Sequence, residues 1–183
     1  METKINVTIK GTKPLLMHSN KGMLVPKMKT VKSSSYDPDE DAKECLYQND
    51  EGKICVPSMA ILSAMRKAAV NEKKSGAGKK TLKEYVYSGL QIDTDMIVLT
   101  PQEYTVDVQM VSVMRARIPR ARPLFKNWSL NFNLTIVDEQ TWDIGNTRHV
   151  LEQAGKYQGL LDFRPLYGTF EVVSMKVDGK EVK

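Results

Sequence analysis

The sequence predicts an α+β protein whose core follows the order strand, helix, strand, strand, helix, strand. Several segments have a two-residue apolar period, which is typical of half-buried strands. Two segments between them carry apolar residues at helical spacing instead. The chain has 183 residues, of which 41% are hydrophobic and 27% charged, as in an ordinary soluble protein with one core. We therefore expect one domain over residues 1–183.

The first predicted strand covers residues 4–10, where Ile5, Val7 and Ile9 alternate with polar residues, and Gly11 and Pro14 end it. Residues 18–55 then show no sustained period, so we expect a long insertion after this strand. Within it, residues 36–41 are expected to form a solvated acidic turn.

The first predicted helix begins at Pro57 and Ser58 and runs to about Lys74, before Gly76 and Gly78. Its expected apolar stripe consists of Ile61, Ala64, Met65 and Ala68. Residues 90–99 form a further possible strand.

The two middle strands of the core are expected at residues 104–110 and 128–136, each with one face in water. In the first of them, Val106, Val108 and Met110 would form the apolar face. The segment joining the two strands, residues 114–126, is too long for a tight turn and contains alternating arginines. It predicts a projecting basic finger.

The second helix is expected to begin near Asn146 and to end at Ala154, with Gly155 in the left-handed conformation after it. A last strand covers residues 170–177. The order corresponds to a ferredoxin-like (RRM-like) βαββαβ core with a long insertion after the first strand and a basic finger between the middle strands. Many unrelated functions use this arrangement, so it does not decide the function.

Positive charge is concentrated in three blocks. Residues 10–35 hold six lysines and no acid, and residues 65–83 and 111–130 are strongly basic as well. Acidic stretches, at residues 37–51 and 84–110, lie between them. This segregation suggests a bipolar surface with a patch that binds phosphates. The alternative is that each block is a solvated loop.

A glycine-containing loop at residues 154–170 joins the second helix to the last strand. It contains Gly155, Gly159 and Gly168, and it resembles the glycine-rich loop of the RAMP superfamily, the repeat-associated RNA-binding proteins of CRISPR systems. Leu161 stands where a glycine would fit the pattern better. The insertion and the finger also resemble those of the backbone subunits of CRISPR effector complexes, whose finger is called the thumb.

The resemblance implies an RNA-binding subunit that polymerises along a guide RNA in a cytoplasmic ribonucleoprotein complex of antiviral defence. In the loop, Lys156 and Arg164 would neutralise phosphate. Alternatively, the loop is only a helix cap and a packed corner in which Arg164 pairs with Asp162.

The expected wet face of the sheet carries no aromatic platform for stacking bases, so binding would follow the phosphate backbone through loops. Four aromatic residues could still stack or wedge bases, although we expect the two phenylalanines in the core. These residues are Tyr157, Tyr167, Phe163 and Phe125.

Catalysis has little support in the sequence. The two histidines are His18, after the first strand, and His149, in the second helix. No nucleotide-binding, acyl-transfer or zinc-protease motif is present. Cys45 and Cys55 are expected to be plain thiols, and we expect no metal, no cofactor and no contact with a membrane.

We therefore expect a non-catalytic protein that binds single-stranded RNA together with copies of itself in a helical array and with other effector-complex subunits. Two alternatives remain: a single-stranded DNA-binding or annealing protein of a mobile element, whose partner would be single-stranded DNA, and a RAMP-type endoribonuclease that uses His18. The candidate contact residues are Lys27, Lys29, Lys32, Arg66, Lys67, Arg115, Arg117, Arg120, Arg122, Lys156 and Arg164.

Overall fold

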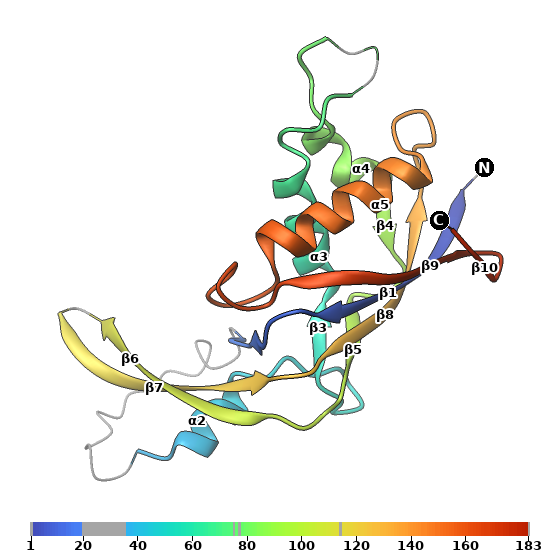
Figure 1. The fold of residues 1–183 in the computed structure, drawn as a ribbon. Helices are drawn as coiled ribbons and strands as arrows, with labels where there is room; N and C mark the ends of the chain where they lie inside the picture. The colour runs from blue at the N-terminus through green and yellow to red at the C-terminus, as the bar shows by residue number, and fades with distance from the viewer. Residues whose placement is uncertain (1, 20–35, 75, 77, 114, 183) are drawn as a thin grey trace.

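The computed structural model describes residues 2–19, 36–74, 76, 78–113 and 115–182, and Figure 1 shows its architecture. It is a mixed α+β structure with antiparallel sheets, which confirms the predicted fold class. The elements of the main sheet and its helices are β1 (Thr3–Gly11), β3 (Cys55–Pro57), α3 (Ser58–Ala68), η2 (Leu82–Tyr85), α4 (Val86–Gly89), β4 (Leu90–Ile92), β5 (Met96–Thr100), β8 (Ser129–Ile136), α5 (Ile144–Gln153), η3 (Ala154–Gln158), β9 (Phe170–Val177) and β10 (Lys180–Glu181). The remaining elements are β2 (Leu15–Leu16), α2 (Pro38–Glu44), β6 (Thr105–Val113) and β7 (Ala116–Phe125).

The main sheet has the strand order β10-β9-β1-β8-β5-β3, and β4 also pairs with β8. Strand β1 lies at its centre, antiparallel to β8 and to β9. The predicted first, last and second middle strands are all present, because each places alternate apolar side chains on one covered face.

Helices α3 and α5 cover one face of this sheet (Figure 1). The core between them contains Ile5, Val7, Ile61, Met65 and Val150, all with no exposed surface. The opposite face is polar: the Asn6 amide donates to the side-chain oxygens of Asn131 and Asn133 at 3.2 and 2.9 Å. Among the described residues, no helix is long and apolar enough to cross a bilayer.

Helix α3 is shorter than predicted, because it ends at Ala68 rather than near Lys74. The apolar stripe runs out at Ala69, and the next apolar residue, Val70, is 44% exposed. Without a face to bury, the following residues do not continue the helix. The possible strand at residues 90–99 is likewise divided into β4 and β5.

The acidic segment after residue 36 is helix α2, not the predicted solvated turn. Asp37 caps the helix by accepting hydrogen bonds from the backbone N–H groups of Asp39 and Glu40, and Pro38 opens it. Asp41 of this helix is buried.

The predicted strand at residues 104–110 was assigned to the wrong sheet. Strand β6 pairs along its whole length with β7, and β2-β7-β6 form a separate three-stranded sheet. The finger is therefore the β6–β7 hairpin, which projects from the rest of the protein in Figure 1. Val108 and Met110 of β6, the expected apolar face, are 49% and 60% exposed.

The end of the second helix also differs from the prediction. Asp143 caps α5, and the helix continues past Gly155 through the π-helical turn η3 to Gly159, which has a φ of 66°. Gly155 instead allows a close approach, since a Cβ there would lie 2.3 Å from the carbonyl oxygen of Phe170.

Candidate nucleic-acid interface

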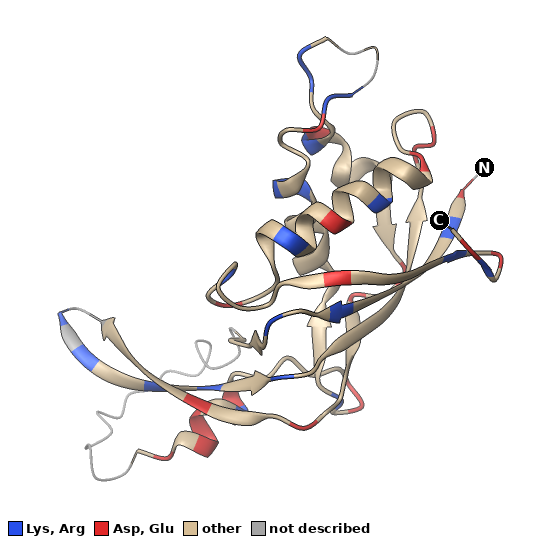
Figure 2. Ribbon diagram, in the orientation of Figure 1, with Lys and Arg blue, Asp and Glu red and all other residues tan. Residues whose placement is uncertain are grey.

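The tip of the finger carries exposed positive charge. Arg115 lies in the turn between β6 and β7 with a φ of 70°, and Arg117 follows on β7; both are exposed. Neither has an ion pair with a described residue. Figure 2 shows this positive charge at the far end of the hairpin. These two guanidinium groups are free to bind an anion from outside the protein.

Arg120, further down β7, is held by helix α2. Its Nη1 lies 3.5 Å from Oδ1 of Asp41, and its side chain is 40% exposed. The other carboxylate oxygen of Asp41 accepts hydrogen bonds from the backbone N–H of Ala121, at 2.9 Å, and from the hydroxyl of Tyr36, at 3.0 Å. Burial and the bond to Asp41 raise the pKa of Tyr36 to about 12. The acidic helix α2 thus lies against the basic finger, and Figure 2 shows it beside β7. The expected bipolar surface, with acidic and basic segments on opposite sides, is therefore not what this part of the protein has.

Arg122, at the base of the finger, is buried. Its Nε lies 2.7 Å from Oδ2 of Asp162, and its guanidinium stacks on Phe163 with Cζ 5.0 Å from the ring centre. Nδ1 of His18 lies 3.8 Å from the same Asp162 oxygen. The nearby His18 imidazole and the charge of Arg122 hold the pKa of Asp162 below its usual value. Arg122 therefore joins the finger to the loop that follows α5.

In that loop, Lys156 and Arg164 both lie at the surface. The Nζ of Lys156 lies 5.2 Å from the ring centre of Tyr157, and Nη1 of Arg164 donates to the carbonyl oxygen of Leu161 at 3.3 Å. The partner of Asp162 is Arg122, not Arg164 as in the alternative interpretation of the loop. Leu161, where a glycine was expected, has a φ of 58°, a conformation that glycine adopts more readily.

Two of the other candidate contact residues lie away from this group. Arg66 and Lys67 lie in the last turn of α3, and the Arg66 guanidinium is 5.4 Å from the ring centre of Tyr87. The rest of that basic block follows α3 at the far end of the protein from the finger (Figure 2). Three further candidates lie outside the described residues: Lys27, Lys29 and Lys32.

The aromatic residues divide differently from the prediction. Phe125 is 1% exposed and belongs to the core, as expected. Phe163, also expected in the core, is 42% exposed beside Arg122, and Tyr157 is 54% exposed. The loop thus presents two rings next to cations, an arrangement that suits stacking on bases.

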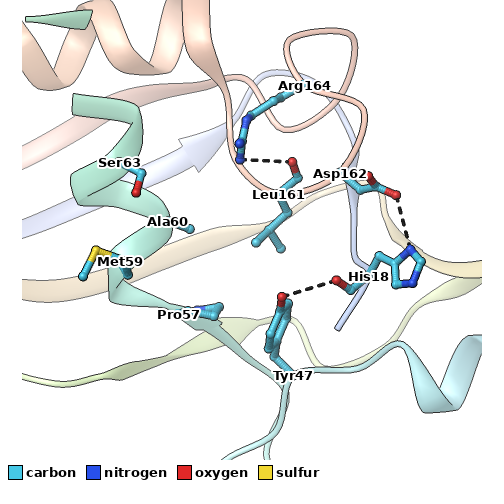
Figure 3. A pocket seen from close by; sticks show the side chains of 9 residues that line it. All are labelled: His18, Tyr47, Pro57, Met59, Ala60, Ser63, Leu161, Asp162 and Arg164. Carbon is cyan, nitrogen blue, oxygen red and sulfur yellow. Dashed lines mark hydrogen bonds and ion pairs between the residues drawn. The ribbon is translucent and has the colours of Figure 1, made fainter. Parts of the chain in front are cut away.

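A pocket of about 320 Å³ opens between this loop, the start of α3 and the chain after β2 (Figure 3). Its apolar side consists of Pro57, Met59, Ala60 and Leu161. The polar lining residues are His18, Asp162, Arg164, Tyr47 and Ser63, of which Ser63 lies on α3 beside the apolar residues. In the part of the chain that the structure describes, no group of three or more His, Cys, Asp or Glu side chains could hold a metal ion.

Comparison with solved structures identifies this architecture. The structure is similar to a chain in "Cryo-EM structure of the Type III-B Cmr-beta bound to cognate target RNA", with a TM-score of 0.52 and 12% sequence identity over 96% of this chain. The chain shares its fold with that solved chain. It spans 60% of the length of that solved chain.

The shared fold confirms, at the level of architecture only, the resemblance to the RAMP superfamily found in the sequence. A weaker similarity is found to "Crystal structure of Cmr6 from Pyrococcus furiosus", with a TM-score of 0.44 and 10% sequence identity. It covers 94% of this chain and 99% of that one, and we draw no conclusion about the fold from it. No family model and no curated protein matches the sequence.

Sequence reasoning missed three residues of this candidate site: Asp41, Tyr47 and Asp162 as the partner of Arg122. Each acts through a residue far away in the chain; Asp162 meets Arg122 and His18, and Asp41 meets Arg120. No periodicity or spacing encodes such pairs. The one signal in the sequence was the density of arginines in the β7 segment, which indicates that some of them pair with acidic residues of other segments.

Proposed function

We propose that the chain is a non-catalytic RNA-binding subunit of a CRISPR-type ribonucleoprotein complex, and that it follows the phosphate backbone of a single-stranded RNA. The observation that carries this proposal is the exposed pair Arg115 and Arg117 at the tip of a projecting hairpin in a RAMP-type fold. The similar solved chain belongs to a Cmr-beta structure bound to target RNA.

The surface between finger and loop supports backbone contacts. Arg115 and Arg117 lie on the finger, and Lys156 and Arg164 lie on the loop that Arg122 ties to the finger base. Tyr157 and Phe163 of the same loop offer exposed rings next to Lys156 and Arg122. Charges that bind phosphates, together with rings that accept any base, give salt-dependent binding with weak sequence preference. Arg120 and Arg122 contribute by positioning the finger.

We also propose that the core is a ferredoxin-like βαββαβ unit formed by β1, α3, β5, β8, α5 and β9. The neighbour order β9-β1-β8-β5, with both helices on one face, supports this assignment. In that arrangement, residues 18–55 are an insertion after β1 and the finger is an insertion between β5 and β8.

The proposal is tested by RNA binding at a series of salt concentrations. Binding should weaken with salt, and the double variant Arg115→Ala/Arg117→Ala should reduce the log–log slope by about 1.4, at roughly 0.7 per phosphate contact on a single strand. Lys176→Ala/Lys180→Ala is a matched control, since it removes the same charge at the β9–β10 end of the sheet, away from the finger. A wild-type slope near zero, or equal losses in both double variants, would contradict backbone contact through the finger.

Assembly in several copies along the RNA is part of the proposal. The exposed Val108 and Met110 on the finger and the acidic helix α2 beside it offer apolar and charged surface for a neighbouring copy. Light scattering should show a small species alone and longer arrays when RNA is added. A fixed dimer that RNA does not change would oppose it.

Single-stranded DNA remains the alternative ligand, because phosphate contacts do not distinguish the two sugars. Competition between RNA and DNA of one sequence decides between them. Tighter binding of the DNA would replace the RNA-binding proposal by the single-strand DNA alternative.

The geometry around His18 favours binding over cleavage. RNA cleavage without a metal needs a general base and a general acid near the reacting groups. The described titratable groups next to His18 are Asp162, whose lowered pKa keeps it ionised, and Tyr47, whose pKa is raised by burial and by Asp162. The Tyr47 hydroxyl also donates to the carbonyl oxygen of His18 at 3.3 Å. Neither group is suited to exchange a proton at neutral pH, so incubation with RNA should release no cyclic-phosphate ends.

A further inference from the structure

The pocket beside Asp162 has two chemically different walls. Met59 and Ala60 of α3 lie with Pro57 on one side of the pocket, and His18 and Asp162 lie on the other, next to Leu161 (Figure 3). A flat heteroaromatic ring, apolar on its faces and polar on its edge, fits such a site. At about 320 Å³ the pocket is at the small end of ligand sites, which run from about 300 to 1,000 Å³, so it suits one nucleotide and not several.

Charge in and around the pocket selects an anionic ligand. Arg164 lines the opening, and Asp162 is offset by Arg122, which leaves one excess positive charge when His18 is neutral. The first turn of α3 lines the same pocket without an acidic residue and without a side-chain cap. A phosphate at the opening would gain from the charge of Arg164, and it would meet no acidic residue in that turn.

Asp162 adds a requirement on the base. Its carboxylate only accepts hydrogen bonds, and Arg122 pairs with Oδ2 at 2.7 Å, while 31% of the side chain is still exposed. An amino group on a base can donate to this carboxylate. A uracil carbonyl at the corresponding position would place oxygen against a negative charge.

We propose that this pocket takes one nucleotide of the bound strand and prefers a base with an exocyclic amino group, which donates to Asp162. The inference rests on the proposed RNA binding and adds a base preference at one position. Cytosine and uracil are the sharpest pair of probes, because they have nearly the same shape and differ where the amino group replaces a carbonyl.

The test compares oligocytidylate with oligouridylate of equal length, by fluorescence anisotropy at fixed salt. The wild-type protein should bind oligocytidylate about tenfold more tightly, the ratio expected for one hydrogen bond to a charged acceptor. In Asp162→Asn the ratio should fall to near one, because the amide both donates and accepts.

A second variant guards against loss of folding in Asp162→Asn. Ala60→Phe fills the pocket from α3 without touching the ion pair, and it should also remove the preference. Val70→Phe is the control, because it enlarges an exposed apolar side chain outside the pocket and should keep the tenfold ratio.

The outcomes separate the two proposals. Salt-dependent binding of both oligomers without a preference, or a preference that survives both pocket variants, overturns the base-selective pocket and leaves the RNA-binding proposal standing. Failure to bind either oligomer overturns the RNA-binding proposal, and the pocket inference with it.

Discussion

Replacing Arg122 by alanine should destabilise the protein strongly, whereas replacing both tip arginines should not. Arg122 is 7% exposed, and its Nε lies 2.7 Å from Oδ2 of Asp162. Removing it leaves a negative charge in a mostly buried place and exposes one side of Phe163. Arg115 and Arg117 have no such partner among the described residues, so their loss costs the fold little.

The size of the effect follows from burial. Removing one partner of a fully buried ion pair costs about 3–5 kcal/mol. Asp162 keeps 31% of its side chain exposed, so water solvates part of the abandoned charge and the expected cost is about 3 kcal/mol. For a chain of this length, about 1 kcal/mol shifts the melting temperature by roughly 2–4 °C, so the Arg122→Ala variant should melt about 6–12 °C lower.

Thermal unfolding followed by circular dichroism measures this difference. The double variant Arg122→Met/Asp162→Leu should recover part of the loss, because it removes both charges and replaces them with apolar side chains. Arg115→Ala/Arg117→Ala is the control and should melt within about 2 °C of the wild-type protein. If Arg122→Ala melted at the wild-type temperature, the ion pair would not hold the finger to the loop.

Two further predictions concern the same loop. Because the folded-state pKa of Asp162 is lowered, its pair with Arg122 stabilises the protein fully above the unfolded pKa of about 3.9, and this stability is lost as the pH falls through the folded pKa. Denaturant unfolding measures the difference in the free energy of unfolding between the wild-type and Arg122→Ala proteins. This difference should be constant near neutral pH and become smaller in acid. A difference that stays constant into strong acid would be inconsistent with an ionised pair. Gly168→Ala should lower the melting temperature more than Gly179→Ala. Both glycines have a positive φ, but only a Cβ at position 168 would meet the backbone, at the carbonyl oxygen of Leu160. Equal losses in the two variants would mean that this close approach is unimportant.

Much of the main sheet was predictable because each of its strands buries one face. Alternation located β1 and β8 within a few residues, and Pro57 with Ser58 marked the start of α3, whereas α5 begins at Ile144 with Asp143 as its cap and not near Asn146. These patterns arise from burial against a single core, which sequence periodicity reports directly. The end of α3 was not predictable in the same way, since no glycine or proline marks Ala68.

The finger shows where periodicity fails. The alternation of Val106, Val108 and Met110 correctly indicates a strand, but it does not say which strand pairs with it or whether anything covers its apolar face. Strand β6 pairs with β7 and leaves the core, so Val108 and Met110 are exposed. The predicted strand was right and its place in the sheet was wrong.

The sequence predicts that all four arginines of the finger bind nucleic acid. In the structure they differ in exposure, because Arg115 and Arg117 are exposed whereas Arg122 is buried. Arg120 and Arg122 meet Asp41 and Asp162, which lie 79 and 40 residues away in the chain. Such partners depend on how α2 and the loop after α5 fold back on β7. A sequence can show that cations are dense in a segment but not which of them the fold neutralises.

This division gives the basic segment two different tasks. The pair formed by Arg122 and Asp162 fixes the base of the hairpin to the loop that carries Lys156 and Arg164. The hydrogen bond that the backbone N–H of Ala121 donates to Asp41 fixes the same strand to α2. A hairpin anchored at two points holds its tip at a defined distance from the loop, so less conformational entropy is lost when the tip arginines bind. The buried arginine therefore matters to binding through geometry, and Arg122→Lys, which keeps the charge but not the planar fork, should weaken RNA binding without removing a phosphate contact from the salt slope.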